Sequence, residues 1–101
     1  MWVFVFFDLP TETKQDKKEY LNFRKRILAA GFCMFQFSAY RRHCPTIENA
    51  DVHIRRVKRI LPPHGNVGIL RLTDLQYKKM IIFQAQKQIM LPESSQQLEF
   101  S

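Results

Sequence analysis

Residues 2–10 read Trp2-Val3-Phe4-Val5-Phe6-Phe7-Asp8-Leu9-Pro10 and contain a run of six apolar side chains. All six are aromatic or β-branched, which predicts a strand that is buried on both faces. Pro10 cannot donate a ladder hydrogen bond, so we expect the strand to end with Asp8 at its rim. A carboxylate at this place either caps the turn or takes part in metal binding and proton chemistry. The segment alone leaves both roles of Asp8 open.

The size and charge of the chain limit its class. Its 101 residues suffice for one domain with a core and leave no room for two. Sixteen Lys and Arg against nine Asp and Glu give a net charge of +7. This surplus favours a polyanionic partner, although a basic protein can also be simply well solvated. No segment approaches the ~20 apolar residues of a membrane span, and the N-terminal run lacks the basic start of a signal peptide. We therefore expect a cytoplasmic protein without membrane contact.

Cysteine and histidine do not form a recognisable metal motif. The two cysteines, Cys33 and Cys44, are too few for a disulfide framework, and no Cys-x-x-Cys occurs. The spacing of His43, His53 and His64 fits no usual pair of zinc ligands, so we expect no metal there. Cys33 is interpreted as a small core residue.

The first helical segment extends from residue 11 to Gly31, which is expected to end it. Either Thr11 or Thr13 can cap its N-terminus. The predicted apolar face contains Tyr20, Phe23, Ile27 and Ala30. Leu21 and Leu28 fall on the opposite side with Lys14, Lys18 and Lys25. These leucines form either a contact surface for another chain or the scattered exposed leucines found on most proteins.

The second helical segment begins at Thr46, the predicted N-cap, and ends before Pro62-Pro63. Its apolar stripe is predicted to contain Ile47, Ala50, Ile54, Val57 and Leu61. The opposite face carries Arg55, Arg56 and Arg59. This helix therefore combines a core face with a basic face.

The remaining segments have the period of strands. Residues 32–44 are long for one strand, so we expect a break near Ser38. The face with Gln36 and Ser38 is expected to pair with a symmetry mate. A further strand is predicted at residues 67–73, Asp74 is expected to cap a short turn, and residues 80–83 form one more short strand. The polar tail ends with an apolar segment at residues 98–100, which is too short to be stable alone.

This order is the β-α-β-β-α-β plan of the ferredoxin-like α+β class, with an extra C-terminal strand. We assign residues 1–84 to the domain and residues 85–101 to a C-terminal tail with a short strand. Side chains such as Phe4, Phe6 and Met34 have no third layer to cover them. A homodimer joined sheet to sheet is therefore expected.

Four segments resemble the family of the second CRISPR-associated protein, and more narrowly its type II version. They are residues 6–13, 36–40, 41–45 and 67–76, in the order and spacing of the family, and residues 96–100 also look familial. The resemblance implies a ferredoxin-like homodimer at the centre of the spacer-acquisition complex. Such a dimer is flanked by dimers of the integrase, the first CRISPR-associated protein. Together they hold a short protospacer duplex, and the integrase inserts it into the CRISPR array.

The same resemblance implies a second activity. Many family members are metal-dependent nucleases on RNA or double-stranded DNA, with Mg²⁺ or Mn²⁺ held between two copies of a strand-end aspartate. Asp8 matches that role in this chain. The family's C-terminal segment commonly adds a strand to the partner's sheet, which implies a purpose for residues 98–100. Ala39 departs from the family, where a β-branched residue is more usual.

Positive charge independently predicts binding to double-stranded DNA. Twelve of the sixteen basic residues lie on the two expected helices and at the strand end between them. Such charges bind phosphates without reading sequence. The candidates are Arg41, Arg42, Arg55, Arg56 and Arg59, with Lys14, Lys18 and Lys25 behind them.

The sequence is compatible with three functions. No second acid, Lys or His shares a motif with Asp8, so we favour a non-catalytic architectural subunit that binds duplex DNA. The alternative is a stand-alone Mg²⁺-dependent endonuclease with Asp8 at the dimer interface, as in toxin ribonucleases of the VapD type, which share this fold. A regulatory domain for a small ligand is disfavoured, because the chain has three glycines and no Gly-rich loop.

Overall fold

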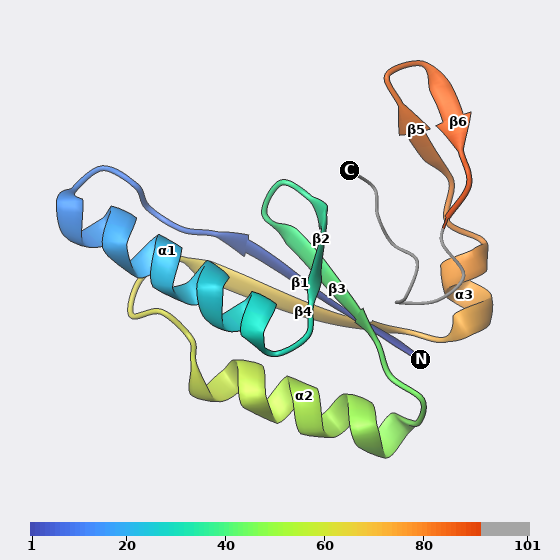
Figure 1. The fold of residues 1–101 in the computed structure, drawn as a ribbon, viewed down its shortest axis with the longest axis horizontal. Coiled ribbons are helices and arrows are strands. Elements are labelled where there is room, and N and C mark those ends of the chain that lie inside the picture. Colours follow the sequence, from blue (N-terminus) through green and yellow to red (C-terminus); the bar gives the residue numbers. More distant parts are fainter. Residues whose placement is uncertain (92–101) are drawn as a thin grey trace.

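The apolar run forms β1 (Trp2–Asp8), which lies inside a four-stranded antiparallel sheet. The protein is described by a computed structural model in which residues 1–91 are placed. β3 (Ala39–His43) pairs with one side of β1 and β4 (Asn66–Leu72) with the other, while β2 (Cys33–Gln36) pairs with β3 at an edge. The helices α1 (Lys14–Ala29) and α2 (Ile47–Arg59) cover one face of the sheet (Figure 1). The predicted β-α-β-β-α-β order is confirmed.

The main core lies between this sheet and the two helices. Val3, Val5 and Phe7 of β1 are buried against Phe23 and Ile27 of α1. The Phe7 and Phe23 rings meet edge to face with their centroids 5.1 Å apart, a favoured aromatic geometry. Burying each of these large side chains contributes about 1.5–3 kcal/mol, so this contact holds α1 on the sheet.

Both long helices begin at a threonine. Of the two candidates for α1, Thr13 is the N-cap: its Oγ1 accepts a hydrogen bond from the Asp16 N–H at 3.0 Å, and the Asp16 carboxylate accepts one from the Thr13 N–H. Thr46 caps α2 as predicted, accepting from the Asn49 N–H at 3.0 Å. Gly31 follows α1 with φ +89°, a left-handed conformation that favours glycine.

The predicted apolar stripe of α2 is only partly correct. Ala50 and Val57 are buried, but Ile47 and Leu61 are exposed. Ile47 is the first residue of the helix and Leu61 lies beyond its last, so both fall at the margins of the packed face. The buried position between Ala50 and Val57 is occupied by His53.

The break near Ser38 is confirmed, and it is the turn of the β2–β3 hairpin, where Ser38 has φ +65°. A register shift between Met34 and Gln36 divides the predicted face. Tyr40 and its partner Met34 lie on the helix side, whereas Gln36 pairs with Ala39, opposite Phe6, and so lies on the other side of the sheet. Pairing of the Gln36 face with a symmetry mate stays a prediction. Cys33 is exposed, against the prediction that it is a core residue, because β2 lies at an edge of the sheet. The buried cysteine is Cys44.

A short helix and a last strand, both after β4, were not predicted from the sequence. Thr73, and not Asp74, caps the short helix α3 (Asp74–Lys78). The expected strand at residues 80–83 is β5 (Ile82–Gln84), which pairs with β6 (Lys87–Ile89) in a hairpin that projects from the main sheet (Figure 1). The division drawn between residues 84 and 85 falls in the turn of this hairpin, and the strand expected at residues 98–100 lies outside the described residues. Within residues 1–91, no helix has the length and apolar character needed to cross a membrane.

The buried His53 makes the fold sensitive to acid. Its side chain is 4% exposed, and burial lowers the pKa of the imidazole below 6.5, with the positive charges of Arg42 and Arg56 acting in the same direction. In the unfolded chain this histidine takes up a proton as the pH falls through 6.5, whereas in the folded chain its lowered pKa delays protonation to lower pH. Stability is therefore lost below pH 6.5 and unaffected by His53 above it.

We predict that His53→Leu reduces this acid sensitivity. Between about pH 7.5 and about pH 5.5, the wild-type free energy of unfolding should fall by up to about 1 kcal/mol more than that of the variant. Urea unfolding at the two pH values measures this difference. Equal pH dependence of wild type and variant would contradict it, and His64→Leu, at an exposed histidine, is the control.

Candidate functional site

Asp8 is the last residue of β1 and lies opposite Asn66 of β4. Side chains alternate along a strand, so Asp8 shares a face with Trp2, Phe4 and Phe6. This is the sheet face that α1 and α2 do not cover, and we call it the open face. The carboxylate is exposed, as expected for a residue at the rim.

The loop before β4 closes tightly on this rim. Gly65 has φ +95°, and a Cβ placed on it would lie 2.8 Å from the backbone oxygen of Asp8 and 2.7 Å from the Leu9 side chain. Only glycine fits such an approach without a shift of one of the two segments. The position of Asp8 is thus set both by the β1–β4 ladder and by this loop.

Asp8 is the carboxylate that the end of β1 offers to a divalent cation. Among residues 1–91, no group of three or more His, Cys, Asp or Glu side chains is placed to hold a metal ion. Mg²⁺ and Mn²⁺ take oxygen ligands, and Mg²⁺ commonly keeps several waters beside one or two carboxylates. Asp8 therefore fits a metal site as one half of a pair supplied by two copies of the chain.

The structure corrects the expected position of Arg41. Its side chain is 2% exposed and lies on the open face among aromatic rings, with the guanidinium 5.7 Å from the Trp2 centroid and 5.3 Å from the Phe35 centroid. Its Nε donates a hydrogen bond to the Tyr77 hydroxyl at 3.3 Å. The Tyr77 ring stacks on the Trp2 ring, with the two ring centroids 4.0 Å apart. The exposed strand end suggested by the sequence is covered by α3, so Arg41 is a structural cation.

Arg42 is also engaged within the fold. Its Nη1 donates to the Ala30 carbonyl at 2.7 Å, at the C-terminal end of α1, where a cation is favoured by the helix dipole. A Cβ on Gly31 would lie 1.8 Å from the same Nη1, so the glycine makes room for this contact. Nearby, burial raises the pKa of the Cys44 thiol, against the opposing charge of Arg42. The Arg42 side chain itself is partly buried.

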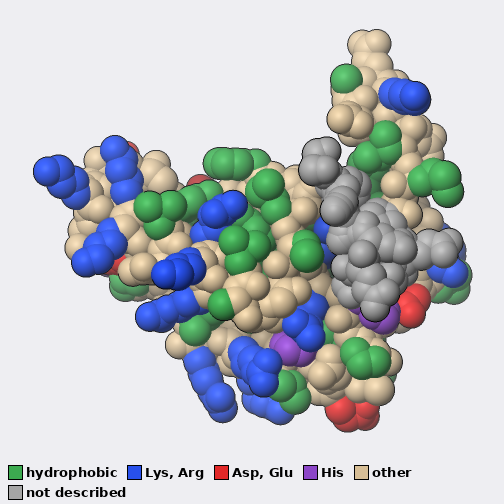
Figure 2. All heavy atoms as spheres, viewed as in Figure 1, with side chains coloured by type: hydrophobic (Ala, Val, Ile, Leu, Met, Phe, Trp, Pro, Cys, Tyr) green, Lys and Arg blue, Asp and Glu red, His purple; other side chains and the backbone are tan. Residues whose placement is uncertain are grey.

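The other predicted basic residues do lie at the surface. Arg55, Arg56 and Arg59 are exposed on α2, and Lys14, Lys18 and Lys25 are exposed on α1. Figure 2 shows Lys and Arg side chains over both helices on the viewed face, with few acids among them. The structure thus places six of the eight predicted DNA-binding residues on the surface and two within the fold.

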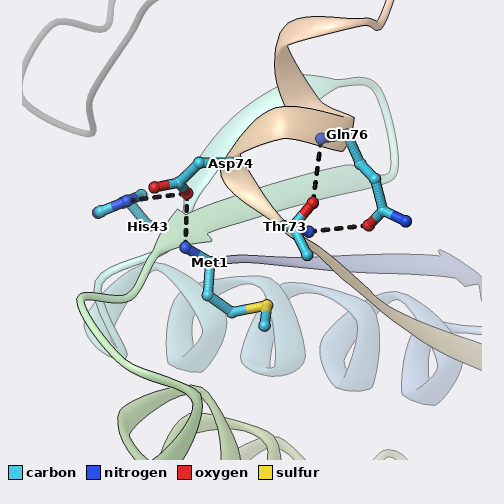
Figure 3. A network of polar contacts seen from close by, with 5 residues as sticks. All are labelled: Met1, His43, Thr73, Asp74 and Gln76. Carbon is cyan, nitrogen blue, oxygen red and sulfur yellow. Dashed lines mark hydrogen bonds and ion pairs between the residues drawn. The ribbon is translucent and has the colours of Figure 1, made fainter.

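A polar network that the sequence did not reveal lies beside the aromatic cluster (Figure 3). The Asp74 carboxylate accepts a hydrogen bond from the Met1 amine at 2.5 Å and lies 3.3 Å from the His43 Nε2. The bond from Met1 holds the pKa of Asp74 below its usual value, against the opposing effect of burial, and the His43 ring contributes. The network ties α3 to the ends of β1 and β3. No local pattern links these positions, which are far apart in the chain.

Arg41→Gln is expected to weaken the fold. The substitution removes a buried cation from two aromatic rings and a hydrogen bond from Tyr77, which should lower the free energy of unfolding by about 2 kcal/mol. Arg55→Gln, at an exposed position on α2, is the matched control and should change it by less than about 0.5 kcal/mol. Urea unfolding of the two variants checks the contrast, and equal stabilities would contradict the structural role of Arg41.

The element order, with a strand-end aspartate beside an open sheet face, defines an α+β domain of ferredoxin-like plan. The family model described as CRISPR associated protein Cas2 matches residues 1–80. A protein of Flavobacterium psychrophilum named CRISPR-associated endoribonuclease Cas2 is 48% identical over 99 residues, which cover 98% of this chain and 86% of that protein. The chain belongs to the CRISPR-associated protein Cas2 family.

Other relatives carry the same name. The Parvibaculum lavamentivorans protein is 42% identical over 99 residues, or 98% of each chain. One from Streptococcus mutans is 33% identical over 100 residues, covering 99% of this chain and 92% of its own length. The resemblance to the family noted in the sequence is therefore confirmed.

Proposed function

We propose that this protein is the central homodimer of a spacer-acquisition complex, where it holds a protospacer duplex between integrase dimers. The observation that carries the proposal is the exposed row of Arg55, Arg56 and Arg59 on α2. These side chains lie on one face of a helix in a chain of net charge +7. Such a row neutralises phosphates without reading bases, as required of a subunit that accepts duplexes of any sequence.

The part of the open face that α3 leaves uncovered supports a homodimer. Tyr77 covers Trp2 and Phe4, but Phe6 and Leu70 remain exposed. On the β5 side, Ile81 and Phe83 are exposed as well. A second copy packed on this face would bury these apolar groups, and two-fold dimers are the commonest oligomers.

A second candidate function is a metal-dependent endonuclease, in line with the word endoribonuclease in the names of the relatives. A dimer formed through the open face brings two strand-end carboxylates to one interface. A bound Mg²⁺ or Mn²⁺ would supply Lewis acidity and an activated water. Asp8 would supply a ligand oxygen from each copy. Because no group of three or more His, Cys, Asp or Glu side chains among residues 1–91 is placed to hold a metal ion, we place this activity second.

Duplex binding should depend on α2. In Arg55→Gln/Arg59→Gln, affinity for a short labelled DNA duplex should fall, and the slope of log K against log salt should become shallower by about one for each arginine that contacts a phosphate. Fluorescence anisotropy at several salt concentrations measures both quantities. Lys87→Gln on β6 is the matched control for loss of an exposed charge. An unchanged slope in the α2 variant, or an equal loss in the control, would count against the proposed DNA surface.

Asp8→Asn separates the two functions. Integration of a labelled duplex into a CRISPR array by the cognate integrase should require this protein and proceed equally with wild type and Asp8→Asn. Hydrolysis of RNA or duplex DNA in Mg²⁺ or Mn²⁺, if present in wild type, should be lost in the variant, because an amide is a poor ligand for a divalent cation. Glu12→Gln is the control for loss of a nearby carboxylate.

Either of two results would change this conclusion. Loss of integration in Asp8→Asn, with the dimer intact by light scattering, would make the metal site central to function. Integration that proceeds without this protein would overturn the architectural role and favour the endonuclease.

A further inference from the structure

A groove of about 580 Å³ lies between α1 and the β2–β3 hairpin. Tyr20 and Leu21 line it from α1, and Met34 and Phe37 line it from the hairpin. Three of these side chains are unusually open to solvent: Leu21 is 61% exposed, Met34 is 48% exposed and Phe37 is 85% exposed. Large apolar groups that converge on one groove from two elements mark a binding surface more strongly than scattered ones do.

The outer face of α1 surrounds this apolar group with positive charge. At about 100° per residue, Leu28 lies within about 20° of Leu21 around the helix. Five basic residues lie within about 60° of Leu21: Lys14, Lys17, Lys18, Arg24 and Lys25. The acids of α1, Asp16 and Glu19, lie at least about 140° away, on the other side. Figure 2 shows the same mixture, with hydrophobic side chains over α1 and the hairpin and Lys and Arg beside them.

One of these cations is held in place at the groove. The Arg24 Nε donates to the Tyr40 hydroxyl at 2.7 Å, and Tyr40 is buried. Since the side chain is already ordered, it loses less conformational entropy when it pairs with an incoming carboxylate. Asp8 is the one acid among the described residues that line the groove, so the charge around it remains positive.

We propose that this groove binds an acidic segment of a partner protein, anchored by at least two large apolar side chains. Burial of each anchor against Leu21, Met34 and Phe37 contributes apolar contact, and the surrounding cations select acidic neighbours. A DNA duplex offers phosphates and no comparable apolar side chains, so it would leave these groups unburied. The homodimer proposed above is placed on the open face, through Phe6 and Leu70, and not on this groove. The inference is independent of the DNA contacts assigned to α2.

Selection from a display library of random 16-residue peptides, with full-length protein as bait, tests this proposal. Binders should be enriched in Asp and Glu together with two or more of Leu, Ile, Phe, Met and Trp. Leu21→Ser and Phe37→Ser, both at exposed positions, should each lower the affinity for the selected peptides by about tenfold or more, as measured by fluorescence anisotropy. The double variant Lys18→Glu/Lys25→Glu should lower the peptide affinity by a similar factor, because the new carboxylates repel the acidic peptides.

Matched controls define the surface. Leu75→Ser, which removes an exposed leucine from α3, and Arg56→Glu, which reverses a charge on α2, should leave peptide affinity unchanged. Circular dichroism of each variant checks that it is folded. Duplex DNA affinity should be unchanged in Leu21→Ser and Phe37→Ser.

Several outcomes would overturn the proposal. Enriched peptides that are basic or lack apolar residues, or that bind the Leu21→Ser and Phe37→Ser variants as tightly as wild type, would show that the groove is not such a site. An equal loss of DNA affinity in these variants would assign the face to nucleic acid. Enriched peptides that match residues 92–101 would assign the groove to the chain's own C-terminal segment.

Discussion

The burial of β1 on both faces is the constraint on which the rest of the structure depends. Because β1 pairs with β3 and β4, its backbone hydrogen bonds are satisfied within the sheet. Val3, Val5 and Phe7 then hold α1 and α2 against one face, and Trp2 and Phe4 hold α3 against the other. The same pairing brings Asp8 opposite Asn66, where the ladder ends and the side chain reaches solvent. The core and the rim are therefore consequences of one strand.

The two faces of the sheet differ in how completely they are covered. Two long helices close the first, whereas a helix of five residues covers only part of the second. Arg41 lies in that covered part, where aromatic rings and a hydroxyl compensate for the loss of water around its charge. The uncovered part, with Phe6 and Leu70, is the surface for which a second copy is proposed. The cationic row of α2 and the mixed apolar and cationic face of α1 are chemically distinct from it and from each other.

Most of the secondary structure was predictable because its signals are local. Alternation of side chains, helical periodicity, Thr13 and Thr46 as caps and the turn at Ser38 all act within a few residues. α3 and the β5–β6 hairpin were harder, since short elements have weak periodicity and depend on the contacts they make. The same reasoning placed Asp8 at a strand end and the arginines of α2 on an outward face. It misplaced Arg41 and Arg42 and overlooked His53, because nothing near them in the chain shows what packs on them.

The sequence by itself determined the order of the elements from β1 to β4, the family and the surplus of positive charge, since periodicity, motif spacing and composition are properties of the chain alone. The tertiary structure alone decided which charges are available to a partner. Arg41 meets Tyr77, and Arg42 meets Ala30, only after the sheet has formed. It also brought Leu21 of α1 and Phe37 of the hairpin to one groove. Burial is a property of neighbours, and these neighbours are separated along the chain and adjacent only in space.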